Sequence, residues 1–94
     1  MWRVQWDRTV QKQILKLPFS MVGSFYDWVH AVEQLGMERV RVLPGYHDEK
    51  LKGPLRGLRS VRISKTYRVL YYETEQGLVK VARITRISKH DYKK

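Results

Sequence analysis

Hydrophobic residues recur at two different spacings along the chain, and these spacings predict its elements. The first six residues place Trp2, Val4 and Trp6 at every second position, which predicts a short amphipathic strand. After Asp7 the hydrophobic residues recur three and four positions apart, as on one face of a helix. We therefore predict a helix that Asp7 caps and that Pro18 ends.

A second helix is predicted between Ser20, its N-cap candidate, and Gly36, a natural stop in the left-handed conformation. Its hydrophobic residues share one face and are assigned to the core: Met21, Phe25, Trp28, Val29, Val32 and Leu35. His30 falls off this face and is predicted to lie at the surface. Residues 37–43 fit either a short strand or an extended linker.

The second half of the chain predicts a loop followed by strands. Glycine and proline interrupt residues 46–57, which predicts a loop with at most one helical turn. Alternating β-branched, aromatic and polar residues then predict an antiparallel meander of three strands, at 58–63, 67–73 and 78–86. The remaining residues, 87–94, form a polar tail that we expect to carry function and to contribute little stability.

The predicted order of elements is β-α-α-β-β-β, which is an α+β fold. Two consecutive helices need a sheet face to cover their apolar stripes, so we expect both helices to pack on one face of a small antiparallel sheet. The first strand is expected to join that sheet. The chain has 94 residues, enough for a single domain that spans 1–94.

Composition excludes several classes of protein. Hydrophobic residues make up 43% of the chain and aromatic residues 12%, which argues against disorder. The chain has no cysteine, and its three histidines lack zinc-finger spacing, so we predict neither a disulfide framework nor a bound metal or cofactor. We find neither an apolar run of membrane-spanning length nor a signal-peptide pattern, and we expect a cytoplasmic protein.

The net charge of +10 lies entirely in the second half of the chain. Residues 1–49 carry six basic and six acidic residues, whereas residues 50–94 carry thirteen basic and three acidic ones. This asymmetry favours a nucleic-acid partner, although an acidic protein or an anionic membrane surface would also fit. The membrane fits least well, because the basic residues lie on predicted strands rather than on an amphipathic helix.

Basic side chains on strand positions are held on a fixed surface, which suits a polyanion. The alternative is a solvated, charged edge that opposes aggregation. Under the first interpretation the predicted RNA-binding residues are Lys50, Lys52, Arg56, Arg59, Arg62, Lys65, Arg86 and Lys89.

The same region holds residues that suit RNA cleavage without a metal. That reaction needs a base for the ribose 2′-OH, a cation for the phosphate and an acid for the leaving 5′ oxygen. The candidates are Glu49 as base, Arg68 as phosphate clamp and His90 as acid, with Tyr92 stacking on a base or donating to the phosphate. These candidates also have ordinary explanations. Glu49 could be a surface carboxylate, Arg68 could be a strand residue that pairs with a nearby glutamate, and His90 could be a solvated residue of a polar tail.

Three stretches, EKLKG, LRGLRSVRIS and TYRVLYY, are followed by a short tail with a histidine and a tyrosine. Together they resemble the RelE/ParE superfamily of type II toxins, above all its RelE, YoeB, YafQ and HigB branch of ribosome-dependent messenger-RNA interferases. The resemblance covers nearly the whole chain and is strongest over residues 46–72. It implies the same β-α-α-β-β-β fold.

The resemblance also implies roles for particular residues. Arg68 stands where the family keeps its phosphate-contacting arginine, and Glu49 stands where YoeB-like members have their glutamate base. His90 and Tyr92 fall where those members have a C-terminal histidine and tyrosine, but Asp91 separates them here.

The implied function is a metal-independent endoribonuclease that cuts messenger RNA in the ribosomal A site. In that family the 2′-OH attacks and leaves a 2′,3′-cyclic phosphate and a 5′-OH end. The implied partners are the ribosome, messenger RNA and a cognate antitoxin. The alternative is a ParE-like toxin that inhibits DNA gyrase without cutting RNA, which does not need the four candidate catalytic residues. A basic RNA-binding module or an inactive toxin relative is a third possibility.

Overall fold

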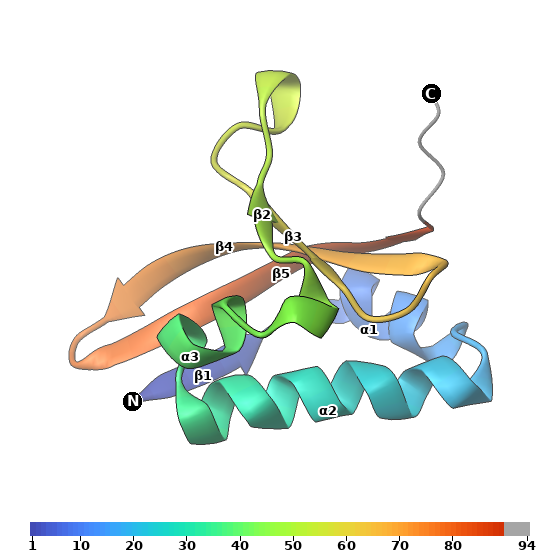
Figure 1. The fold of residues 1–94 in the computed structure, drawn as a ribbon, viewed down its shortest axis with the longest axis horizontal. Helices are drawn as coiled ribbons and strands as arrows, with labels where there is room; N and C mark the ends of the chain where they lie inside the picture. Colours follow the sequence, from blue (N-terminus) through green and yellow to red (C-terminus); the bar gives the residue numbers. More distant parts are fainter. Residues whose placement is uncertain (90–94) are drawn as a thin grey trace.

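The computed structural model describes residues 1–89, which form one sheet and a layer of helices (Figure 1). The elements in chain order are β1 (Trp2–Gln5), α1 (Arg8–Leu15), α2 (Phe19–Leu35), α3 (Met37–Arg41), the 3-10 turn η1 (Pro44–Tyr46), β2 (Glu49–Lys50), the 3-10 turn η2 (Gly53–Leu55), β3 (Arg59–Arg62), β4 (Tyr67–Gln76) and β5 (Val79–Lys89). The predicted α+β class is confirmed.

The sheet has five strands in the order β1-β5-β4-β3-β2. Strands β2 to β5 pair antiparallel, but β1 pairs parallel with β5, with Trp2 opposite Lys80 and Gln5 opposite Arg83. The sheet is therefore mixed, and our prediction of an antiparallel sheet is wrong at β1. Parallel neighbours need a long connection between them, and everything from α1 to β4 supplies it here.

The helices pack on one face of the sheet and leave the other face without a helical cover, as predicted. Figure 1 shows α2 running the length of the molecule below the sheet. The face of α2 that meets the sheet carries the predicted stripe, of which Phe25, Trp28, Val29 and Val32 are buried. Leu35, at the end of α2, is 48% exposed and is not a core residue.

The helix boundaries follow the predicted signals only in part. The Asp7 carboxylate accepts a hydrogen bond of 3.0 Å from the amide of Val10, so Asp7 caps α1 as predicted. Ser20 does not cap α2, because the helix begins at Phe19 and Pro18 occupies the cap position. Gly36 ends α2 with a φ of 88° and a ψ of 147°, which is a positive φ but not the left-handed helical conformation.

Residues 37–41 form a short helix, so both of our interpretations of this segment, strand and linker, are wrong. The alternation of Val40 and Val42 suggested a strand, but Val42 is 76% exposed. The residues that pack are Met37 and Val40, which are fully buried and three positions apart, as on one face of a helix.

Strand β5 runs three residues further than predicted, to Lys89. Ile87 is buried against the core, and its amide donates a hydrogen bond of 2.8 Å to the Oε1 atom of Gln13 in α1. Residues 87–89 are thus part of the sheet, although they were predicted to belong to the polar tail. Among the helices of residues 1–89, none has the length and apolarity needed to cross a membrane.

Candidate active site

Arg68 is a buried cation on the sheet face that the helices leave free. It lies on β4 and is 4% exposed. Its Nε atom donates to the hydroxyl of Ser60, and its Nη2 atom donates to the carbonyl oxygens of His47, at 2.8 Å, and of Ser60, at 3.1 Å. The guanidinium is therefore fixed in orientation before any ligand binds.

Burial lowers the pKa of Arg68, because the charged guanidinium is removed from water; the carboxylates of Glu49 and Asp48 oppose that shift, and the positive charge of Arg62 adds to it. An arginine remains protonated near neutral pH under such conditions. The site therefore holds a desolvated positive charge, which interacts with a phosphate more strongly than an exposed charge does.

Glu49, the predicted base, lies next to Arg68. Its Oε2 atom is 3.5 Å from Nη2 of Arg68, and its side chain is 64% exposed. The pairing of β2 with β3, which sets Glu49 opposite Ser60, holds the glutamate at this position. A carboxylate that reaches solvent beside a fixed cation can both meet a substrate and accept a proton.

These two residues line a cavity of about 400 Å³, which is in the size range of small-ligand sites. Its wall combines leucine side chains with polar and cationic ones: Glu49, Leu51, Leu55, Ser60, Arg68, Leu70, Arg86, Ser88 and Lys89. Four of the residues predicted from the sequence, Glu49, Arg68, Arg86 and Lys89, are thus brought together. We refer to this cavity as the Arg68 cavity.

A bulge in β5 brings Arg86 to the Arg68 cavity. Leu70 of β4 pairs with Arg86 and Tyr71 pairs with Ile84, so Thr85 is the extra residue. In a regular strand Ile84 and Arg86 would share a face, since side chains alternate. The bulge lets Ile84 enter the core while Arg86 lies on the free face.

Lys50, Lys52 and Arg56 lie on a projecting segment, residues 49–58, that we call the arm. Figure 1 shows the arm rising from the sheet on the side away from α2. All three side chains are exposed, and Leu51 and Leu55 of the same arm form part of the wall of the Arg68 cavity. Lys50 and Arg56 line a separate cavity together with Arg59 and Glu73, so the arm presents these two cations on the other side of the Arg68 cavity wall.

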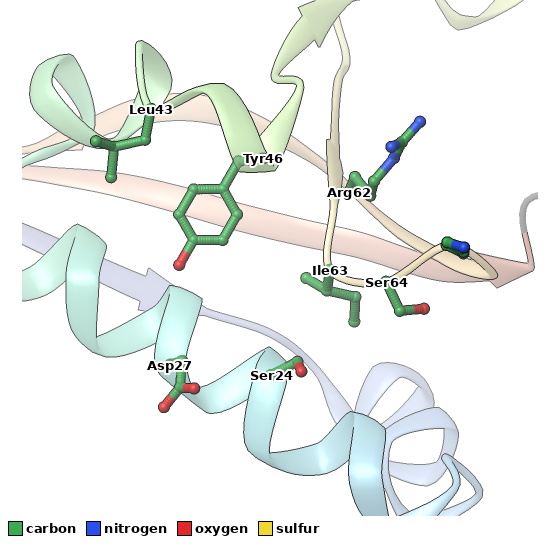
Figure 2. Close-up of a pocket in the computed structure, with 9 residues that line it drawn as sticks. Ser24, Asp27, Leu43, Tyr46, Arg62, Ile63 and Ser64 are labelled. Atoms are coloured by element: carbon green, nitrogen blue, oxygen red, sulfur yellow. The ribbon is translucent and has the colours of Figure 1, made fainter.

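Arg62 and Lys65 line a different cavity, of about 380 Å³, beside η1 and α2. Figure 2 shows Tyr46 pointing from η1 toward α2, where Asp27 lies, whereas Arg62 extends from β3 in the opposite direction. Burial raises the pKa of Tyr46, and the negative charge of Asp27 acts in the same direction. Arg62 pairs across the strands with Arg68, and its positive charge acts to lower the pKa of Arg68.

Arg59 is turned away from the Arg68 cavity and belongs to a buried polar cluster that the sequence did not predict. Its Nε atom lies 2.6 Å from Oδ1 of Asp48, whose side chain is 1% exposed. The hydroxyl of Tyr71 donates to the other oxygen of the same carboxylate. Arg41 approaches Asp48 at 3.9 Å and also pairs with Glu73.

The charges in this cluster alter its titration. Although burial acts to lower the pKa of Arg59, its hydrogen bond and charge interaction with Asp48 raise it above the ordinary value. Burial, followed by the hydrogen bond to Asp48, raises the pKa of Tyr71. The cluster therefore places the Asp48 side chain between two arginines and a tyrosine whose raised pKa keeps it neutral at neutral pH.

Two predicted catalytic residues, His90 and Tyr92, lie outside the described residues, so their placement stays a prediction. Within residues 1–89, there is no group of three or more histidine, aspartate or glutamate side chains arranged to hold a metal ion. Sequence reasoning missed His47 and Ser60, which bind Arg68, and Asp48, which binds Arg59 and Tyr71. The run His47-Asp48-Glu49 was visible in the sequence, but nothing in it indicated that Asp48 is buried.

Neither the protein-family models nor the curated protein sequences yield a match to this chain. Solved structures do match. A YoeB/ParE toxin from Agrobacterium tumefaciens superposes with a TM-score of 0.71 at 18% identity, over 95% of this chain and 99% of that one. The chain has the fold of the RelE and YoeB toxins.

Two further structures, one of a RelE-type toxin and one of a YafQ toxin, support this assignment. The RelBE2 toxin–antitoxin complex of Mycobacterium tuberculosis matches with a TM-score of 0.66 at 25% identity, over 94% of this chain and 96% of the other. A YafQ mutant from E. coli matches with a TM-score of 0.69 at 14% identity, over 96% and 94%. The resemblance that the sequence motifs indicated is thus confirmed by the fold.

Proposed function

We propose that this protein is the toxin of a type II toxin–antitoxin system and that it cuts messenger RNA on the ribosome. The observation that carries the proposal is the contact between Glu49 and Arg68, 3.5 Å apart, at the wall of a cationic cavity. The motifs around these two residues resemble those of the RelE and YoeB interferases, and the chain has their fold.

In this proposal each residue has one task. Glu49 takes the proton from the ribose 2′-OH, which then attacks the adjacent phosphorus. The new bond forms between the 2′ oxygen and phosphorus, the bond to the 5′ oxygen breaks, and the products are a 2′,3′-cyclic phosphate and a 5′-OH end. His90 returns a proton to the leaving oxygen. The proposed reaction balances without an oxidant, a nucleotide cofactor or a metal.

Arg68 stabilises the charge that builds on the phosphate oxygens. Its Nε and Nη2 atoms are engaged by Ser60 and His47, so the guanidinium does not have to reorganise when the negative charge develops. Arg86 and Lys89, in the same wall, contribute further positive charge. Tyr92 is the proposed contact to a base or to the phosphate.

The proposed partners are the ribosome, messenger RNA and an antitoxin. Two structures with this fold are described as complexes with an antitoxin, the RelBE2 complex and a YoeB–YefM complex from Staphylococcus aureus. Here the excess of positive charge favours an acidic partner segment that covers the cationic surface. The proposed location is the cytoplasm, where ribosomes are found.

The test is induction of the protein in bacteria followed by mapping of RNA 5′ ends. New 5′-OH ends within translated messages, together with growth arrest, are expected. Intact messages accompanied by double-strand DNA breaks would contradict the proposal and support gyrase inhibition instead. Co-expression with the protein encoded by the neighbouring gene is expected to restore growth.

Arg68→Ala tests the contact between Glu49 and Arg68 on which the proposal rests. Loss of one preorganised charge-stabilising donor costs on the order of 10²–10³ in rate, so cleavage should fall by that factor. Arg8→Ala, which removes the same charge from α1, is the matched control and should cut at the wild-type rate. Circular dichroism of both variants establishes that they are folded. A folded Arg68→Ala variant with full activity would show that the clamp lies elsewhere.

A further inference from the structure

The two residues before Glu49 are attached to opposite faces of the sheet. His47 has a φ of 45° and a ψ of 51°, and it is the one non-glycine residue with positive φ among residues 1–89. Its carbonyl oxygen accepts a hydrogen bond of 2.8 Å from Nη2 of Arg68, on the free face. Residues keep such a conformation where their surroundings impose it, often at functional sites.

Asp48 is fixed on the other face, under the helices. Its two carboxylate oxygens accept bonds from Nε of Arg59, at 2.6 Å, and from the hydroxyl of Tyr71. These partners belong to β3 and β4, so Asp48 attaches the start of β2 to both strands that follow it in the sheet. A side chain that is 1% exposed has little freedom to move.

The position of Glu49 depends on this attachment. Side chains alternate along a strand, so an Asp48 held on the helix side directs Glu49 to the free face, beside Arg68. Strand β2 has only two residues, each with one pairing partner in β3. The Glu49 side chain is 64% exposed, so its own packing does little to hold it.

We infer that Asp48 is a positioning residue for the proposed cleavage reaction: it holds Glu49 at Arg68 without touching the substrate. The inference rests on the proposed function, since it assigns a task within that reaction. Misplacing a catalytic group by about 1 Å costs on the order of 10²-fold in rate. Loosening the attachment of β2 should therefore lower the rate of the chemical step and leave RNA binding, which uses the cationic surface, nearly unchanged.

A purely structural Asp48 would behave differently, and a double-mutant cycle separates the two roles. If Asp48 acts through Glu49, replacing Asp48 should have no further effect on the cleavage rate once Glu49 has lost its base function. Asp48→Asn should then slow cleavage in the wild-type background but not in a Glu49→Gln background. A residue that supports only the fold would lower the rate by the same factor in both backgrounds.

The experiment measures single-turnover cleavage of a ribosome-bound message by wild type, Asp48→Asn, Glu49→Gln and the double variant. We expect Asp48→Asn to lower the maximal rate by roughly 10²-fold with less than about a threefold change in half-saturating ribosome concentration. We expect the double variant to match Glu49→Gln. Asp27→Asn, the same change on α2 away from the Arg68 cavity, should cut at the wild-type rate.

Tyr71→Phe is the second variant if Asp48→Asn does not fold. It removes one of the two donors to Asp48 while the ring stays in place, so a smaller loss with the same non-additivity is expected. A wild-type rate in a folded Asp48→Asn variant, or equal losses in both backgrounds, would overturn the inference and leave the proposed function intact. A wild-type protein that cuts no message would instead refute the proposed function.

Discussion

Replacing Tyr71 by phenylalanine tests whether the buried cluster around Asp48 contributes to stability. The change removes one hydroxyl and keeps a ring that is fully buried and packs against Trp28 at a centroid distance of 5.5 Å. The lost interactions are the hydrogen bond to the Asp48 carboxylate and a contact of 3.4 Å with the sulfur of Met37. Any effect on stability therefore comes from the hydroxyl.

The size of the effect follows from the acceptor. A hydrogen bond to a charged group contributes about 1.5–3 kcal/mol net. Asp48 keeps its bond from Arg59 at 2.6 Å, so the carboxylate is not left without a partner, and we expect a loss near the lower part of that range, about 2 kcal/mol. For a domain of this size that lowers Tm by roughly 8–16 °C.

The pH dependence gives a second test. The pKa of Tyr71 is raised in the folded protein by burial and by the bond to Asp48, whereas the unfolded chain titrates near the ordinary value of about 10. A group with a raised pKa stabilises the fold fully below its unfolded pKa and loses that contribution as pH rises toward the folded value. The difference in stability between wild type and Tyr71→Phe should therefore be constant below pH ~10 and shrink above it.

The assay is urea unfolding followed by circular dichroism at several pH values. Tyr72→Phe is the matched control, because Tyr72 is the next residue, points to the opposite face and is 39% exposed. Its stability should stay within about 0.5 kcal/mol of wild type. Equal stabilities for the two variants at neutral pH would refute the reasoning, as would a Tyr71→Phe deficit that grows above pH ~10.

Three other predictions concern a backbone position, the charged surface and the end of the chain. Gly36→Ala should lower stability by roughly 1–2 kcal/mol in thermal unfolding, because φ is 88° and a Cβ would meet Glu38 at 3.3 Å; Gly23→Ala, in open space on α2, should not. Ribosome binding should weaken by roughly 10²-fold between 50 and 200 mM salt, and a flat response would exclude the cationic surface as the contact. Deleting residues 90–94 should leave Tm unchanged and slow cleavage about 10²-fold, with His90→Gln reproducing most of that loss; full activity would remove the tail from the site.

Local patterns were enough to predict most of the elements. The spacing in α2 and the alternation in β3 and β4 each follow from one element packed on one neighbour, so sequence alone predicts them. The same reasoning failed at residues 37–41, where the strand-like alternation of Val40 and Val42 competed with the helical spacing of Met37 and Val40. The second pattern was the informative one, because both of those side chains are fully buried in the core.

Features that depend on distant segments could not be predicted in this way. Strand β1 could have paired in either direction, since its alternation is the same in both. The bulge at Thr85 left only a faint signal, the spacing of three between Ile84 and Ile87, which no regular strand would give to two core residues. Arg59 was assigned to RNA binding because it is basic. Its ion pair with Asp48 becomes visible only when β2 and β3 lie side by side in the folded sheet.

Glu49 and Arg68 were nevertheless both assigned to one candidate site, because the family resemblance carries information about the folded site that periodicity does not. The residues that hold them were missed for the opposite reason. His47 contributes a backbone carbonyl and Ser60 a hydroxyl on a strand, and neither group is distinctive in a sequence.

The parallel pairing of β1 with β5 also determines when the protein can fold during its synthesis. β1 is made first, but its partner in the sheet is the last described strand, residues 79–89. Until that segment has been made, the helices that follow β1 cover an incomplete sheet, and the Arg68 cavity lacks Arg86 and Lys89. For a protein proposed to act on ribosomes, this order of synthesis means that the cationic site cannot be complete until residues 79–89 have been made.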